Sequence, residues 1–232
     1  MTLWIKVCGN TSLEDALVAV EAGADAVGFV FAPSPRRVTP AQAAAIVSHL
    51  PATAEKIGVF VDAPLDEIYA TVRECGLTGV QLHFEADSDL PARLHDHLGP
   101  QLRILRVLHF GAESEAQAAT QNAAAIADQL AQHAVNPHVH AVLIDSRTAS
   151  AVGGTGVAFD WEIARRTLFQ DAEAPKRLIA AGGLNPSNAA QAIATLRPWG
   201  VDAVSGVEAA PGRKDPVKVR AFVARARAAE TK

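Results

Sequence analysis

The sequence contains few of the residues that build cross-linked, metal-bound or membrane-embedded proteins. Only two cysteines, Cys8 and Cys75, occur in 232 residues, too few for a disulfide framework and without the spacing of metal ligands. No apolar run approaches the ~18 residues of a membrane helix. Residues 1–6 also lack a basic segment followed by a signal-peptide core. The sequence therefore predicts a cytoplasmic protein with reduced thiols.

A strong charge of one sign is also missing. There are 21 Lys and Arg against 25 Asp and Glu, a net charge of -4, and the basic residues are scattered. This distribution argues against a nucleic-acid or anionic-membrane surface. The chain has no dinucleotide fingerprint and no phosphate-binding loop ending in Gly-Lys-Ser/Thr, and its eight histidines have no convergent Glu or Cys partner. We therefore expect a small-molecule partner, with neither a cofactor nor a metal.

Hydrophobic residues make up 49% of the chain and charged residues 20%, enough to fill one core and keep its surface polar. Barrels of alternating strands and helices commonly have ~200–250 residues in one domain. The sequence therefore predicts that residues 1–232 form a single domain.

Short β-branched apolar runs alternate with longer segments rich in Ala, Leu and charge, the pattern of alternating strands and helices. Each predicted strand is followed by a predicted helix. The strands are expected at 3–7, 26–31, 57–61, 78–82, 103–108, 140–144, 177–181 and 201–204. The helices are expected at 12–22, 40–49, 65–75, 88–98, 114–132, 160–168, 186–196 and 215–228.

Several helix boundaries carry their own signals. Pro40 and Pro186 stand near a first helical turn, and Gly23 and Gly76 follow a last one. Nearly continuous apolar strands indicate a parallel sheet covered on both faces, and eight right-handed crossovers allow that sheet to close. The predicted fold is an α/β protein, a (β/α)8 TIM barrel, with an open doubly wound sheet as the alternative.

In such barrels the active site lies at the carboxyl ends of the strands, so the polar residues that follow each apolar run are the candidates. Those residues differ in chemical type and include a thiol, two carboxylates and an arginine. They are Cys8, Arg36, Asp62, Gln81, His83, Asp145, Gly182, Gly183, Ser205 and Gly206.

The glycines among them predict a phosphate site. Gly182-Gly183 and Ser205-Gly206 occupy the loops after the last two strands, where backbone N–H groups bind phosphate in many barrels. Glycine lets the backbone approach the ligand closely, although it also serves simply to permit tight turns. Gly154 and Gly156, after the sixth strand, add exposed backbone that closes over a ligand.

Several short motifs in this order resemble the phosphoribosylanthranilate isomerase family, and the resemblance spans about residues 5–223. Any one of the motifs is weak, but their combined spacing is specific. They are KVCGNT at 6–11, GFVF with SPR at 28–36, VQLH at 80–83, LIDS at 143–146, GGTG with FDW at 153–161, AGGLNP at 181–186, and SGVE with PG, Lys214 and Asp215 at 205–215.

The resemblance implies an Amadori rearrangement in tryptophan biosynthesis. N-(5-phosphoribosyl)anthranilate becomes 1-(2-carboxyphenylamino)-1-deoxyribulose 5-phosphate, with Asp145 as the general acid and Cys8 as the general base. Arg36 matches the family arginine for the anthranilate carboxylate, with Arg37 as the fallback. Gln81 and His83 are expected to shape the pocket rather than to transfer protons. We expect a monomer.

The proposed roles make demands on the two catalytic groups. Cys8 is expected at an exposed position in the barrel mouth, where positive potential lowers its pKa. The carboxyl of Asp145 needs a raised pKa to act as an acid near neutral pH. The simpler interpretations are a core cysteine and a helix-capping aspartate. Cys75 receives the core interpretation because it precedes Gly76 at a helix end and matches no motif.

Three residues depart from the family pattern: Asn10 replaces Ile or Leu, Phe84 replaces Gly, and Val204 replaces Ser. None removes a proposed catalytic group, so they bear on affinity more than on the reaction. Two rival functions remain. One is the related isomerase of histidine biosynthesis, which presents Asp where Cys8 stands, and the other is a non-catalytic phosphate-binding barrel.

Overall fold

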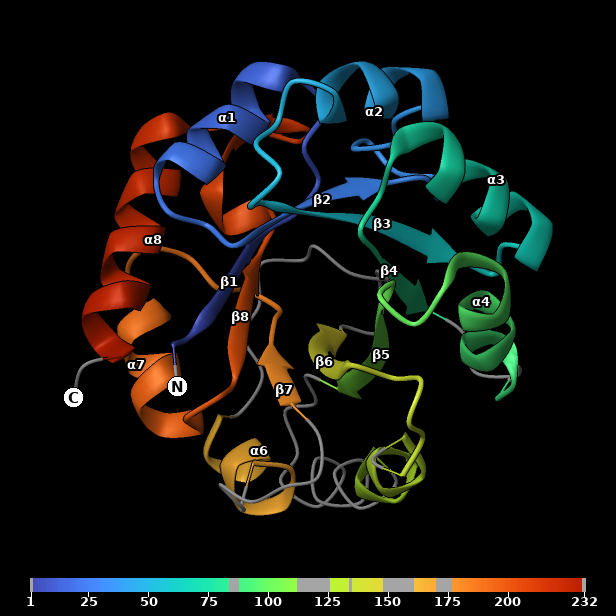
Figure 1. Cartoon of the computed structure of the whole chain (residues 1–232). Coiled ribbons are helices and arrows are strands. Elements are labelled where there is room, and N and C mark those ends of the chain that lie inside the picture. The colour runs from blue at the N-terminus through green and yellow to red at the C-terminus, as the bar shows by residue number, and fades with distance from the viewer. Residues whose placement is uncertain are drawn as a thin grey trace.

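The computed structural model describes residues 2–83, 88–111, 126–133, 135–147, 161–169 and 177–230. Eight parallel strands form a closed barrel in sequence order, and β1 pairs with β8 to complete it (Figure 1). The predicted barrel is confirmed, and the alternative prediction of an open doubly wound sheet is wrong. The strands are β1 (Trp4–Val7), β2 (Ala26–Val30), β3 (Glu55–Val61), β4 (Gly79–His83), β5 (Arg103–Gly111), β6 (Ala141–Arg147), β7 (Arg177–Ala180) and β8 (Gly200–Ala203).

The helices lie outside the strands, and α8 packs against both α1 and α7 (Figure 1). They are α1 (Leu13–Glu21), α2 (Pro40–Val47), α3 (Leu65–Cys75), α4 (Leu90–Leu98), α6 (Trp161–Thr167), α7 (Ala189–Leu196) and α8 (Pro216–Glu230), and residues 126–133 are also helical. After β8 the chain forms a short 3-10 turn, η1 (Ser205–Val207), and then a small hairpin of β9 (Glu208–Ala210) and β10 (Arg213–Lys214).

Local signals set most helix ends. Helix α2 begins with a capping box between Thr39 and Gln42, and Pro40 occupies its first turn as predicted. Helix α3 ends at Gly76, whose φ of 65° is left-handed. The prediction at Pro186 is wrong, because α7 begins only at Ala189. The side chains of Asn185 and Asn188 hydrogen-bond nearby backbone N–H groups and hold the preceding residues in a turn.

Strand lengths follow pairing more than composition. Strand β3 starts at Glu55, two residues earlier than predicted, because Glu55 pairs with Ala26 of β2. Strands β5 and β6 pair with each other up to Gly111 and Arg147, each three residues beyond its predicted end. Of the helix predicted at 114–132, only 126–132 falls among the described residues, and this part is helical.

Alternation along β1 divides its side chains between two layers. Ile5 and Val7 belong to the hydrophobic core that includes residues of α1 and α8. Trp4 belongs instead to a cluster contributed by β1, β2, β3, β5, β6 and β7, inside the barrel. By the same alternation Lys6 and Cys8 face the interior above Trp4. The barrel therefore presents a lysine and a cysteine on the strand that opens the sequence.

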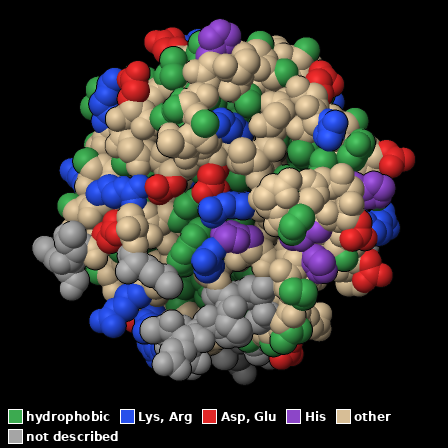
Figure 2. All heavy atoms as spheres, viewed as in Figure 1, with side chains coloured by type: hydrophobic (Ala, Val, Ile, Leu, Met, Phe, Trp, Pro, Cys, Tyr) green, Lys and Arg blue, Asp and Glu red, His purple; other side chains and the backbone are tan. Residues whose placement is uncertain are grey.

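Large exposed hydrophobic side chains are few in the described part of the chain: Val61, Val135 and Val217. On the face seen in Figure 2, hydrophobic side chains are interspersed with charged ones. Among the described residues, no helix is both long and apolar enough to cross a membrane.

Candidate active site

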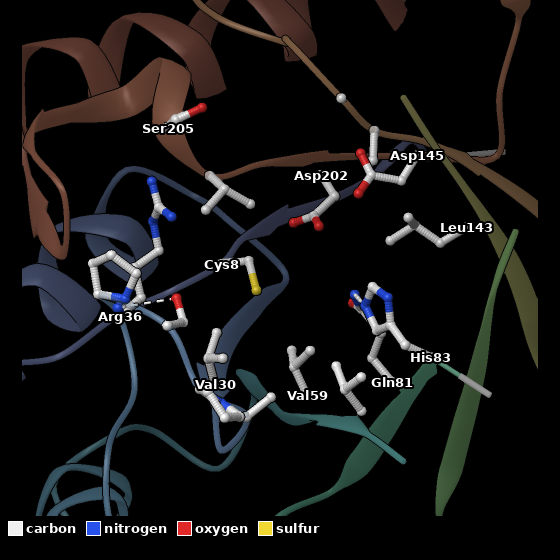
Figure 3. Close-up of a pocket in the computed structure, with 18 of the residues that line it drawn as sticks. Cys8, Val30, Arg36, Val59, Gln81, His83, Leu143, Asp145, Asp202 and Ser205 are labelled. Atoms are coloured by element: carbon white, nitrogen blue, oxygen red, sulfur yellow. Dashed lines mark hydrogen bonds between the residues drawn. The ribbon is translucent and has the colours of Figure 1, made fainter. Parts of the chain in front are cut away.

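A cavity of about 570 Å³ opens at the carboxyl ends of the strands. It brings together most of the residues predicted from the sequence, and Figure 3 shows them converging from different strands. The predicted residues that line it are Cys8, Arg36, Asp62, Gln81, His83, Asp145, Gly182, Gly183 and Ser205. Gly154 and Gly156 lie outside the described residues, and Gly206 follows Ser205 without lining the cavity.

Cys8 lies directly after β1 and points into the cavity (Figure 3). The prediction that it is exposed is wrong, because only 3% of the residue is accessible. The neighbouring strand explains its position: a Cβ placed on Gly28 of β2 would lie 2.4 Å from the Cys8 sulfur. Gly28 therefore provides the space that the thiol occupies.

The pKa of the Cys8 thiol also differs from the prediction. Burial raises this pKa above its ordinary value, and the carboxylate of Asp202 raises it further. The positive charges of Lys6 and Lys214 lower it, but not enough to reverse the effect of burial. The expected cationic neighbours are therefore present, yet the thiol of the unliganded protein is favoured over the thiolate.

A buried ionic network lies one layer below Cys8. The Nζ of Lys6 donates to Oδ2 of Asp202 and to Oε1 of Gln81, at 2.8 Å in both cases. Lys6 is fully buried and Asp202 is 3% exposed. Neither Lys6 nor Asp202 was predicted from the sequence to belong to the site. Lys6 stands two residues before Cys8, so period-2 alternation was the available signal that both face the interior.

Gln81 and His83 project from β4 on the same side of that strand. The Nε2 atoms of the two side chains lie 3.1 Å apart. Burial lowers the pKa of His83 to about 3, and the charges of His109, Lys6 and Arg106 act in the same direction. The imidazole is therefore neutral at physiological pH, which agrees with a role in shaping the pocket.

Asp145 lies on β6, where it pairs in register with His109 of β5. It is half-buried and lines the same cavity as Cys8. In Figure 3, the carboxylates of Asp145 and Asp202 both point toward the space above Gln81 and His83. Asp202 lies between Cys8 and Asp145 in this view.

Arg36 comes from the loop after β2 and is held by a carboxylate that the sequence did not single out. Its Nε and Nη2 donate to the two oxygens of Glu208 at 2.8 Å each. Lys214 donates to the same carboxylate at 3.2 Å. Because this side-on pair uses Nε, the Nη1 side of the guanidinium stays available to a ligand. Arg37 is exposed and does not line the cavity.

The loops after β7 and β8 have the backbone geometry of glycine. Gly182 and Gly183 have φ angles of 81° and 67°, in the left-handed region. A Cβ on Gly206 would lie 2.0 Å from the carbonyl oxygen of Leu184, so this glycine allows the two loops to touch. The chain after β8 forms the 3-10 turn η1, which begins at Ser205 and ends at Val207.

Of the three departures from the family pattern, Asn10 has a structural explanation. The Asn10 side chain is fully buried, and its Nδ2 donates to the carbonyl oxygens of Val7 and Gly28. It therefore ties the turn after β1 to β2. Val204 lines the cavity. Phe84 lies outside the described residues.

Comparison with known proteins places this geometry in a family. The model of the N-(5'phosphoribosyl)anthranilate (PRA) isomerase family matches residues 5–225. The N-(5'-phosphoribosyl)anthranilate isomerase of Pelobacter propionicus is 44% identical over 220 residues, which cover 94% of this chain and 93% of that protein. The chain belongs to the phosphoribosylanthranilate isomerase family.

Solved phosphoribosylanthranilate isomerases have the same fold. The enzyme of Thermotoga maritima is 33% identical with a TM-score of 0.78, and the match covers 98% of this chain and all of that one. Another member, 31% identical with a TM-score of 0.73 over 98% of this chain and all of that chain, was solved with reduced 1-(o-carboxyphenylamino)-1-deoxyribulose 5-phosphate. The Thermotoga maritima enzyme has also been solved as monomers of a dimeric phosphoribosylanthranilate isomerase.

Proposed function

We propose that this protein converts N-(5-phosphoribosyl)anthranilate into 1-(2-carboxyphenylamino)-1-deoxyribulose 5-phosphate, with Asp145 as general acid and Cys8 as general base. One observation carries the assignment of these roles. A thiol from β1 and a carboxylate from β6 line a single cavity in a chain of this family. The cavity is large enough for a substrate of this size.

The chemistry begins with two proton transfers, one to the ring oxygen and one from C2. Asp145 protonates the ring oxygen, the C1–O bond breaks, and an iminium forms between C1 and the anthranilate nitrogen. Cys8 then acts in its thiolate form, the minor form in the unliganded protein, and removes the proton from C2, which the iminium has made acidic. The resulting enolamine gains a proton at C1 and loses its C2 hydroxyl proton to give the ketone. Lys6 and Lys214 supply the positive charge that favours the thiolate.

Two anionic groups orient the substrate across these residues. The Nη1 side of Arg36, held by Glu208, suits the planar carboxylate of anthranilate. The phosphate is assigned to backbone N–H groups of Gly182, Gly183 and Gly206 with the hydroxyl of Ser205, and to the loop of Gly154 and Gly156. Gln81 and His83 contact the sugar between these two ends.

The acid and base roles are tested by turnover of phosphoribosylanthranilate, followed by its fluorescence. Cys8→Ser and Asp145→Asn are expected to leave the fold intact and to reduce turnover at least ~100-fold, the lower range for a positioned acid or base. Cys75→Ser is the matched control. That thiol donates to the carbonyl of Pro40 between α2 and α3, away from the cavity, so it should retain turnover. Near-normal turnover of folded Cys8→Ser or Asp145→Asn would remove that residue from the mechanism.

We also propose that the protein acts in the cytoplasm as a single catalytic domain and as a monomer. Both cysteines are free thiols, which suits a reducing compartment. The few exposed hydrophobic residues of the described chain are scattered, as is typical of a surface that is not an interface. Sedimentation in solution at a mass of 24.3 kDa is the expected result.

A further inference from the structure

Asp202 is a buried carboxylate that lines the cavity, and the mechanism proposed above gives it no role. Asp202 lies on β8, opposite Lys6 in the register between β8 and β1. Its Oδ2 accepts a hydrogen bond from Lys6 at 2.8 Å. Its Oδ1 is buried and has no hydrogen-bond partner among the described residues. Asp202 nevertheless lines the cavity, and Figure 3 shows its carboxylate directed into it.

A buried carboxylate oxygen without a partner is unfavourable. Leaving such an acceptor unsatisfied destabilises the folded protein, so proteins keep these groups where a ligand or another function needs them. Lys6 compensates the charge of Asp202 but reaches only one of its two oxygens. The other oxygen can only accept hydrogen bonds, because an ionised carboxylate has no donor. Its ligand must therefore supply an O–H or N–H group.

The position of Asp202 identifies which donor of the substrate this is. It lies between Cys8 and Asp145 in Figure 3, and both line the cavity with it. Cys8 is assigned to the C2 proton and Asp145 to the ring oxygen bonded to C1. Two donors of the substrate lie beside these atoms, the hydroxyl on C2 and the N–H on C1. The N–H has the ortho carboxylate of the anthranilate ring as its own acceptor, so the hydroxyl on C2 is the donor left for Asp202.

We propose that Asp202 is a further catalytic residue, whose Oδ1 accepts a hydrogen bond from the C2 hydroxyl of the substrate. This bond fixes rotation about C2 so that its hydrogen faces the Cys8 sulfur. It also stabilises the hydroxyl while its proton becomes more acidic, because the enolamine must lose that proton to become the ketone. Lys6 is the positioning residue, since it holds the other oxygen of Asp202 and the amide of Gln81. The proposal rests on the proposed function.

Binding of two product analogues tests this contact without turnover. The first ligand is the reduced product, which retains a hydroxyl on C2, and the second is the same molecule with hydrogen in its place. We expect the wild-type protein to bind the hydroxylated ligand about 10- to 100-fold more tightly, as for a hydrogen bond to a charged group. Asp202→Asn keeps a neutral acceptor and should reduce this ratio.

A double variant separates this role from a structural one. Lys6→Met with Asp202→Leu removes both charges together, which avoids leaving one of them buried and unpaired. It should bind the two ligands within ~3-fold of each other, while its affinity for the deoxy ligand stays near the wild-type value. Asp66→Asn is the control, because Asp66 is an exposed carboxylate in the first turn of α3 that does not line the cavity. This control should keep the wild-type ratio.

The outcomes distinguish the two proposals. Equal binding of the ligands by the wild-type protein, or a wild-type ratio in the folded double variant, overturns the role of Asp202 and leaves the proposed function standing. Failure of the wild-type protein to bind either ligand overturns the proposed function instead. If the double variant does not fold, the ratio in Asp202→Asn decides, and an unchanged ratio there overturns the role of Asp202.

Discussion

Single residues in this barrel take their chemistry from the layer in which they lie. Cys8, Lys6 and Asp202 are each almost fully buried. Lys6 and Asp202 form an ion pair, and Cys8 is proposed to act as a thiolate. Three such groups are stable together because Lys6 carries the compensating charge. Burial by itself lowers the pKa of Lys6, but Asp202 and Cys8 more than offset it and keep the pKa raised. The lysine therefore stays protonated beneath the thiol.

The role of Arg36 can be tested by substituting this single residue. Replacing Arg36 by Met removes the planar cation assigned to the anthranilate carboxylate, so KM should rise about 10- to 100-fold while kcat changes little. Steady-state kinetics with phosphoribosylanthranilate measures both constants. Arg37→Met is the control, since Arg37 is exposed and does not line the cavity. An unchanged KM in Arg36→Met would show that the carboxylate binds elsewhere.

The elements that matter most at the site are the two glycine loops after β7 and β8. Their backbones face the cavity at Gly182 and Gly183, and Gly206 brings the second loop against the carbonyl of Leu184. No charged side chain is needed to bind phosphate here if backbone N–H groups supply the hydrogen bonds. The charge of Lys214 is directed instead to Glu208 and to the carbonyl of Val204.

A crystal grown in phosphate or sulfate should therefore place the anion beside the amides of Gly183 and Gly206. Gly183→Val adds a branched side chain at a φ of 67°, where such residues are strained, and it blocks the approach of the ligand. We expect product affinity, measured by calorimetry, to fall at least ~10-fold, the effect of about 1.4 kcal/mol.

Gly23→Ala is the control for that experiment. Gly23 also has a positive φ, of 97°, but it follows α1 and does not line the cavity. Its substitution should cost stability without changing product affinity. An anion bound elsewhere in the mouth, or normal product binding by Gly183→Val, would contradict the assigned orientation of the substrate.

At the scale of the whole molecule, Glu208 joins the hairpin after β8 to the loop after β2. Burial by itself raises the pKa of Glu208, but Arg36 and Lys214 more than offset this and hold the pKa below its ordinary value. A carboxyl with a lowered pKa stabilises the fold at pH values above its unfolded pKa. That stabilisation disappears as the pH falls from about 4.5, the ordinary pKa, through the lower pKa of Glu208 in the folded protein.

Glu208→Gln should therefore be less stable than the wild type at neutral pH and should lose less stability on acidification below about pH 4.5. Breaking a buried pair costs about 3 kcal/mol at the low end, which corresponds to a Tm lower by roughly 6–12 °C in a chain of this size. Thermal unfolding followed by circular dichroism at several pH values measures both effects. Glu14→Gln, which removes an exposed partner of Arg213, should retain the wild-type profile. Parallel acid profiles for Glu208→Gln and wild type would contradict this account.

The sequence by itself determined the barrel and the residues at its mouth. Eight apolar runs with a crossover segment after each one leave few topologies, and residues that follow parallel strands must meet at one end. This is why Cys8, Arg36, Gln81, His83 and Asp145 could be named in advance and line one cavity. The family resemblance supplied their chemical roles, which composition and periodicity do not contain.

Only the tertiary structure decided the burial and the pairing of these groups. Cys8 is buried because a glycine 20 residues later, on the next strand, makes space for its sulfur. Lys6 meets Asp202, and Arg36 meets Glu208, across separations of 196 and 172 residues. Closure of the barrel brings β8 beside β1, and a pattern read along the chain contains no information on the distance between such side chains. The pKa of a thiol depends on those distances, so its direction became known only once the strands were in place.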